Sequence, residues 1–157
     1  MNAISLYEVS PRDGLQGLPR AIPLRKKVKL IKKLKSAGIE DIEVGSLVHP
    51  SILPMRDSGK LYRKTGGDLL VVNERGFDRA IELGLESVNV VISPDDDFNK
   101  SNQKNTYQNI MKTYQNKCKD IPINRLYISC AFSEGVSRKA VLECVEWGKD
   151  ISKCIVL

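Results

Sequence analysis

Short apolar runs alternate with longer amphipathic stretches along most of the chain. The apolar runs predict β-strands at 4–9, 41–45, 69–72, 87–92 and 125–131, with a further strand beginning at 151. The amphipathic stretches predict helices at 23–37, 57–64, 75–83, 106–117 and 137–149. Strands that alternate with helices are typical of parallel α/β units. We therefore expect an α/β fold with about five to six parallel βα units in a single domain over residues 1–157.

The segment 25–35 supplies much of the net charge of +6. Its cations are Arg25, Lys26, Lys27, Lys29, Lys32, Lys33 and Lys35. Leu24, Val28, Ile31 and Leu34 recur at three- and four-residue spacing, so we expect an apolar face on the core and lysines in water. A basic helix can also attract nucleic acid or an anionic membrane. No aromatic residue alternates with the lysines, as single-strand binding requires. We therefore expect a solvated face and no membrane partner, with a nucleic-acid binder driven by net charge as a third, weaker hypothesis.

Cysteine spacing and the absence of long apolar runs bear on the cellular compartment. The cysteines are Cys118, Cys130, Cys144 and Cys154. They include no Cys-x-x-Cys pair and fit neither a zinc site nor a dense disulfide framework, so we expect reduced, mostly buried thiols, with Cys130 in the fifth strand. The early first strand leaves no room for a signal or transit peptide, and no apolar run approaches a membrane span of about 18 residues. These features predict a cytoplasmic protein.

Charged residues follow the first predicted strand directly. Pro11 and Gly14 break the strand, so Arg12 and Asp13 lie where strand gives way to loop. A carboxylate there can ligate a hard cation, and a guanidinium can hold a developing oxyanion. A surface ion pair in a turn is the alternative, and for an arbitrary Arg-Asp-Gly it is the commoner one.

A third charged residue lies in the second predicted strand. Ile42 and Val44 alternate there with Asp41, Glu43 and Gly45, and alternate side chains of a strand point to opposite faces. In a barrel Glu43 would point inward near the C-terminal mouth, where carboxylates are often catalytic. An inner salt bridge, for example with Arg12, would explain the same carboxylate. The pattern alone leaves both interpretations open.

The string Pro-Arg-Asp-Gly-Leu-Gln at 11–16 resembles the opening of the 3-hydroxy-3-methylglutaryl-CoA lyase family. That family belongs to a group of metal-dependent carbon–carbon lyases and synthases built on TIM barrels. The resemblance continues at 37–50, 75–84 and 128–132. A closed TIM barrel typically needs about 250 residues. The resemblance therefore implies an incomplete barrel of the TIM (β/α)8 type, the N-terminal portion of a lyase domain.

The resemblance also implies a reaction and residue roles. The substrate would be 3-hydroxy-3-methylglutaryl-CoA, and the products acetoacetate and acetyl-CoA. A Mg²⁺ or Mn²⁺ ion would bind the substrate's hydroxyl and carboxylate oxygens. Asp13 matches the family's metal-ligating Asp, Arg12 its catalytic Arg, and Glu43 an active-site Glu.

Several family features have no match in this chain. These are a His-x-His metal-ligand pair, an Asn ligand and a glycine-rich loop with a catalytic Cys. His49, the single histidine, lies outside any His-x-His pattern, and we interpret it as a loop residue. We interpret Asp95, Asp96 and Asp97 as a solvated turn and not as a second metal site.

Two hypotheses follow from this comparison. In the first, the chain is part of a lyase that needs the missing strands, from a longer product or from a C-terminal partner chain. In the second, it is a non-catalytic partial barrel whose strand edges pair with another copy or another protein.

Overall fold

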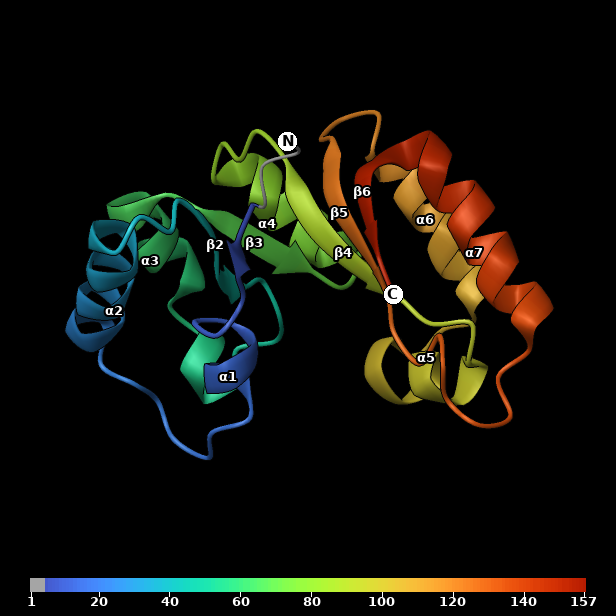
Figure 1. Cartoon of the computed structure of the whole chain (residues 1–157), viewed down its shortest axis with the longest axis horizontal. Helices are drawn as coiled ribbons and strands as arrows, with labels where there is room; N and C mark the ends of the chain where they lie inside the picture. Colours follow the sequence, from blue (N-terminus) through green and yellow to red (C-terminus); the bar gives the residue numbers. More distant parts are fainter. Residues whose placement is uncertain (1–4) are drawn as a thin grey trace. The chain divides into compact units, whose positions relative to one another are not determined.

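Strands and helices alternate along the computed structural model, which describes residues 5–157 apart from the side chain of Asn102 (Figure 1). The alternation expected from the apolar pattern is therefore confirmed. The described part of the chain divides into two compact units, the first ending at residue 70 and the second covering residues 71–157. That the chain forms a single domain stays a prediction.

The first unit contains three strands that pair in parallel. Its elements are β1 (Tyr7–Glu8), α1 (Asp13–Gln16), α2 (Leu24–Ser36), β2 (Asp41–Ser46), the 3-10 turn η1 (Leu53–Met55), α3 (Ser58–Thr65) and β3 (Asp68–Val71), whose last residue begins the second unit. The central strand β2 pairs with β1 on one side and β3 on the other. Strand β1 is shorter than predicted, and residue 4 of that prediction lies outside the described residues.

The second unit repeats the same construction. Its elements are α4 (Glu74–Glu82), β4 (Val88–Ile92), α5 (Asp96–Gln103), α6 (Tyr107–Lys117), β5 (Ile123–Ile128), α7 (Arg138–Ile151) and β6 (Ser152–Val156). Strand β5 pairs in parallel with β4 and with β6. None of the described helices is long and apolar enough to cross a lipid bilayer.

Each unit buries its own set of apolar side chains. In the first unit Ile31, Ile42 and Leu61 are at most 1% exposed, so α2, β2 and α3 share one core. In the second unit the rings of Phe77 and Tyr114 lie 5.4 Å apart and join α4 to α6. Burial of this apolar surface is the main stabilising term for each unit.

The basic helix α2 departs from the expectation that its lysines face water. Lys27 is only 3% exposed, and its Nζ donates a hydrogen bond to the carbonyl of Pro54, at 2.6 Å, and to the carboxylate of Asp57. The reason is helical spacing, because Lys27 and the fully buried Ile31 lie four residues apart on the same face. The other lysines and the arginine of α2 are exposed, as predicted.

The acidic run at 95–97, after β4, is not the solvated turn that the sequence predicted. Asp95 is the N-cap of α5, and its Oδ1 accepts hydrogen bonds from the backbone N–H groups of Asp97 and Phe98. Asp96 and Asp97 form the first turn of that helix. Acidic side chains stabilise this position by capping free N–H groups and by interacting with the helix dipole.

The cysteines are free, but they are less buried than expected. Cys144 is buried, whereas Cys118, Cys130 and Cys154 are half-buried. Strand β5 ends at Ile128, so placing Cys130 inside that strand is wrong. Cys130 lies in the following turn with a φ of 61°, a left-handed conformation that cannot continue a strand.

Candidate active site

The pairing of β1 with β2 decides where the charged loop after β1 lies. Tyr7 is in register with Asp41 and Glu8 with Ile42, so both strands run toward their C-terminal ends side by side. The chain then turns sharply, because the N–H groups of Arg12 and Asp13 both donate to the carbonyl of Val9, at 3.0 and 2.7 Å. This turn starts α1 and brings the Arg12 side chain to β2.

Arg12 connects a buried carboxylate with an exposed one. Its Nε donates a hydrogen bond to Oε1 of Glu43, and its Nη1 donates to Oδ1 of Asp13 at 2.7 Å. The Glu43 side chain is fully buried, while the Asp13 side chain is 66% exposed. The structure thus brings together the three residues singled out in the sequence. Their catalytic and metal-binding roles stay predictions.

The ion pair between Arg12 and Glu43 has a clear structural consequence. A buried carboxylate is strongly destabilising unless a cation or hydrogen-bond donor compensates it. Arg12, whose side chain is 12% exposed, supplies both. The inner salt bridge with Arg12 that was considered from the sequence is therefore present, and Glu43 fixes the orientation of the guanidinium.

A second polar contact joins the same two segments and was not predicted. The hydroxyl of Ser46 donates to Oε1 of Gln16 at 2.8 Å, so α1 is tied to the end of β2. The backbone N–H of Ser46 donates to the hydroxyl of Ser58 at 3.2 Å. The sequence did contain a signal for this contact. Gln16 is the last residue of the string at 11–16 that carries the family resemblance, and Ser46 follows Glu43 by three residues.

The described residues do not by themselves fit a divalent metal ion. No group of three or more His, Cys, Asp and Glu side chains lies close enough to hold one within the described part of the chain. Mg²⁺ requires near-octahedral coordination by oxygen. Asp13 offers one exposed carboxylate, whereas His49 is an exposed loop residue whose Nδ1 lies 2.9 Å from the hydroxyl of Ser51. Asp13 can therefore be one ligand but not a complete site.

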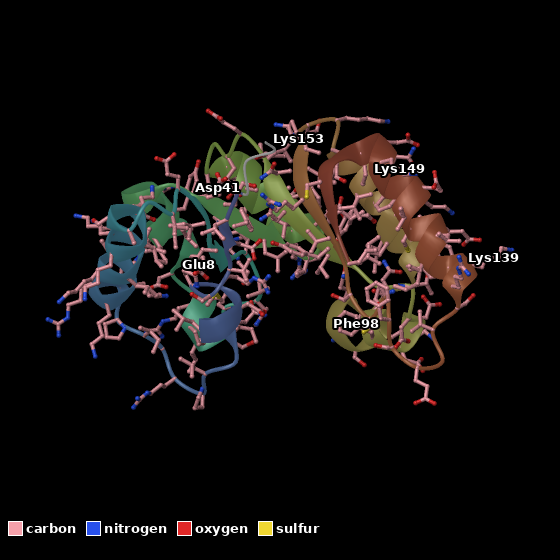
Figure 2. All side chains as sticks on the ribbon, in the orientation of Figure 1. Glu8, Asp41, Phe98, Lys139, Lys149 and Lys153 are labelled. Carbon is pink, nitrogen blue, oxygen red and sulfur yellow. The ribbon has the colours of Figure 1, made fainter. Side chains whose placement is uncertain are left out.

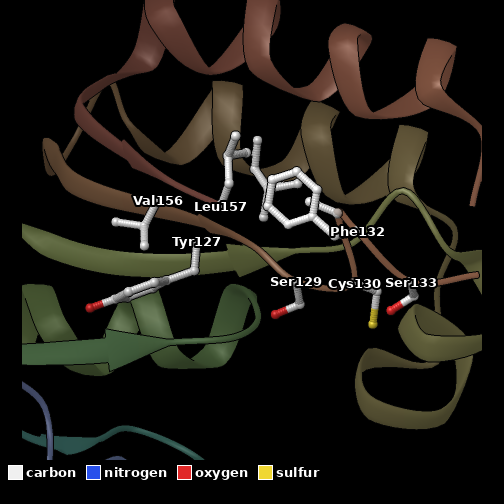
Figure 3. Close-up of a pocket in the computed structure, with 9 residues that line it drawn as sticks. Tyr127, Ser129, Cys130, Phe132, Ser133, Val156 and Leu157 are labelled. Atoms are coloured by element: carbon white, nitrogen blue, oxygen red, sulfur yellow. The ribbon is translucent and has the colours of Figure 1, made fainter.

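The second unit has a pocket of about 440 Å³ beside the C-terminal ends of β5 and β6 (Figure 3). Tyr127, Ser129 and Cys130 line it from β5 and the turn after it, and Val156 lines it from β6. Phe132, which is 83% exposed, also contributes to its wall. The C-terminal ends of parallel strands are where TIM-barrel enzymes bind substrates.

Comparisons with known proteins agree on one family. The family model described as HMGL-like matches residues 3–152. The (R)-citramalyl-CoA lyase of Chloroflexus aurantiacus is 34% identical over 123 residues, which are 68% of this chain and 39% of that protein. The hydroxymethylglutaryl-CoA lyase of Bacillus subtilis is 31% identical over 140 residues, which are 82% of this chain and 47% of that protein. The chain thus spans less than half the length of these two relatives.

A solved structure gives the same result for the fold. The HMG-CoA lyase of Acinetobacter baumannii, in complex with coenzyme A and 3-methylmalate, is similar with a TM-score of 0.84 and 27% sequence identity. The match covers 96% of this chain and 55% of that chain. The fold class expected from the sequence, an α/β fold of the incomplete TIM (β/α)8 type with about five to six parallel βα units, is confirmed, and the described residues contain six strands.

Proposed function

The chain belongs to the HMGL-like family, and from this premise we propose that Arg12, Asp13 and Glu43 are part of an HMG-CoA lyase-type active site. One observation supports the proposal above others. Arg12 lies between a buried and an exposed carboxylate, directly after a barrel-type strand. A guanidinium held in this way has a fixed direction, as a group that stabilises developing charge needs.

The proposed reaction is the cleavage of a carbon–carbon bond in 3-hydroxy-3-methylglutaryl-CoA. The products are acetoacetate and acetyl-CoA, and negative charge develops on the thioester oxygen of the departing acetyl-CoA enolate. Arg12 stabilises this oxygen through its planar N–H donors. Glu43 is the residue that holds Arg12 in position, and its burial excludes water from their contact.

Asp13 is proposed to be one ligand of a Mg²⁺ or Mn²⁺ ion. When bound, such an ion would hold the hydroxyl and carboxylate oxygens of the substrate. Because the described residues contain no group of three or more His, Cys, Asp or Glu side chains that could hold a metal ion, further ligands must come from elsewhere. An acyl-CoA substrate is supported by the relative that was solved with coenzyme A.

The length of the relatives suggests how the site would be completed. The C-terminal part of the fold would come from a longer product or from a C-terminal partner chain. The alternative is a non-catalytic partial barrel that forms a homo-oligomer or binds a partner through a strand edge. It is favoured by the incomplete ligand set among the described residues. Cytoplasmic location stays a prediction under both proposals.

The test combines this chain with a second polypeptide that carries the C-terminal half of a relative. The mixture is assayed for acetoacetate release from 3-hydroxy-3-methylglutaryl-CoA with Mg²⁺. We expect activity, and we expect Arg12→Lys to lower kcat by about 10²–10³-fold because it removes the planar donors. Arg20→Lys, in an exposed loop, is the matched control and leaves kcat unchanged.

A complex that forms without releasing acetoacetate would exclude the enzyme role. Light scattering on the isolated chain tests the alternative in the same preparation. A strictly monomeric chain would count against association through a strand edge.

A further inference from the structure

Helices α2 and α3 form a strongly basic surface on the first unit. They contain ten of the chain's 25 lysines and arginines and none of its 19 acidic residues. The rest of the chain therefore has fewer cations than anions. Apart from the buried Lys27, the cations of this basic surface are exposed: Arg25, Lys26, Lys29, Lys32, Lys33, Lys35, Lys60, Arg63 and Lys64.

The two helices present these charges together. They pack against each other, and Nζ of Lys35 on α2 donates to the carbonyl of Thr65 at the end of α3, at 2.7 Å. Along α2, five exposed cations recur at three- and four-residue intervals, which places them on one face: Arg25, Lys26, Lys29, Lys32 and Lys33. With a rise of about 1.5 Å per residue, this basic stripe extends over about 12 Å.

The stripe is unfavourable for the helix that bears it. The first turn of α2 has no acidic residue but contains Arg25 and Lys26, close to the positive end of the helix dipole. Like charges three and four residues apart repel each other. Among the described residues, no acidic side chain forms a salt bridge with the stripe. Sequence choices that oppose local stability without a folded-state gain are expected at functional positions.

We propose that the basic surface binds the phosphate backbone of a nucleic-acid duplex. Lysines predominate on it, and lysine contacts phosphate as a compact point charge without reading base edges. Tyr62 is the one aromatic residue of the two helices, too few for stacking the bases of a single strand. Binding is therefore electrostatic and independent of base sequence.

From the sequence, a nucleic-acid binder was the weaker alternative to a solvated basic face, and the structure adds two observations in its favour. It adds the cations of α3 to those of α2, and it shows which face of α2 is covered. Ile31 is fully buried, and the exposed large apolar side chains of the described residues lie outside α2 and α3. A helix that binds a membrane interface inserts an apolar face, which this surface does not offer.

The test measures binding of the 157-residue chain to a short, fluorescently labelled DNA duplex by anisotropy at several salt concentrations. The stripe variant carries Arg25→Gln, Lys29→Gln and Lys32→Gln. The control variant carries Lys139→Gln, Lys149→Gln and Lys153→Gln, three exposed lysines of the second unit (Figure 2). Both variants lower the net charge equally. Comparing them therefore distinguishes binding by this local basic surface from binding by overall net charge.

We expect the stripe variant to lose roughly tenfold or more in affinity at low salt, and its salt slope to fall by about 2.7, or 0.9 per lost phosphate contact. The control variant should change affinity by less than about twofold. A charge-preserving variant, Lys29→Arg with Lys32→Arg, should bind as the parent does. Thermal melting should show no loss of stability in the stripe variant, because repulsion along α2 is relieved.

Equal losses in the stripe and control variants would overturn the proposal, since net charge alone would then explain binding. Tighter binding to phosphatidylserine-containing vesicles than to the duplex, at the same salt concentration, would also overturn it. The basic surface contains none of the residues proposed to act in the lyase reaction. The failure of one proposal therefore would not decide the other.

Discussion

The Nε of Arg12 donates a hydrogen bond to Oε1 of Glu43, a carboxylate with no exposed surface. This contact joins the loop after β1 to the centre of β2 and orients the guanidinium proposed to act in catalysis. Because one partner is fully buried, the two residues should contribute to stability as a unit.

Arg12→Met should destabilise the protein by about 3–5 kcal/mol, since it removes the guanidinium that compensates the buried charge of Glu43. Adding Glu43→Leu to that variant should restore much of the loss, because the uncompensated charge is gone. Urea unfolding of the two single variants and the double variant measures the coupling. A double variant no more stable than Arg12→Met would show that the contact does not carry this burial penalty.

Because the amine of Lys27 is buried, substitutions of two lysines in the same helix should differ greatly in their effect on stability. Lys27→Met removes the donor to Pro54 and Asp57 and should lower the free energy of unfolding by up to about 3 kcal/mol, less than for a fully buried pair because Asp57 is 20% exposed. Lys29→Met, on the exposed face, should stay within about 0.5 kcal/mol of the parent. Chemical denaturation compares them, and similar effects would contradict the burial of Lys27.

Gly45 lies where β2 approaches α3 closely. A Cβ at this position would lie 2.4 Å from Oγ and 2.8 Å from Cβ of Ser58, so Gly45→Ala should cost about 1–3 kcal/mol. It should also disturb the hydrogen bond that Ser58 accepts from Ser46. Gly17→Ala is the control, because nothing lies within 4 Å of its Cβ and its φ of −77° suits alanine. A neutral Gly45→Ala in thermal melting would show that β2 and α3 are less tightly packed.

Burial raises the pKa of the Cys144 thiol from 9.0 to about 11, with a smaller contribution from Glu143. The unfolded chain then loses this proton at lower pH than the folded protein, so stability should fall as pH rises from about 9 toward 11. The hydrogen bond to Asp78 raises the pKa of Lys117, and this shift also makes stability fall as pH rises.

The contribution of Cys144 can be isolated by substitution. Cys144→Ala should be less stable than the parent at neutral pH because it leaves a small cavity, but its free energy of unfolding should decline less steeply above pH 9. Urea titrations at several pH values give both slopes. Equal slopes in the parent and in Cys144→Ala would show that other groups cause the loss of stability at alkaline pH.

The order of strands and helices was determined by the sequence alone, because apolar periodicity reports directly which residues face a core. Predicted boundaries agree with the structure within a few residues for β2, α3, β4 and α6. The same local information singled out Arg12 and Asp13 as a charged pair directly after a strand, and Glu43 as a carboxylate in the alternating pattern of the second strand. It failed for Asp96 and Asp97, where capping by Asp95 starts a helix that composition alone did not indicate.

Only the tertiary structure decided which polar groups meet. The pairing of Arg12 with Glu43, of Ser46 with Gln16, and of Lys27 with Asp57 joins residues about 30 positions apart in the chain. Such contacts depend on strand register and helix packing, which a linear pattern of apolar and polar residues does not encode. The sequence therefore singled out candidate residues for the site, while the fold determined which charges are buried, compensated and held in a fixed direction.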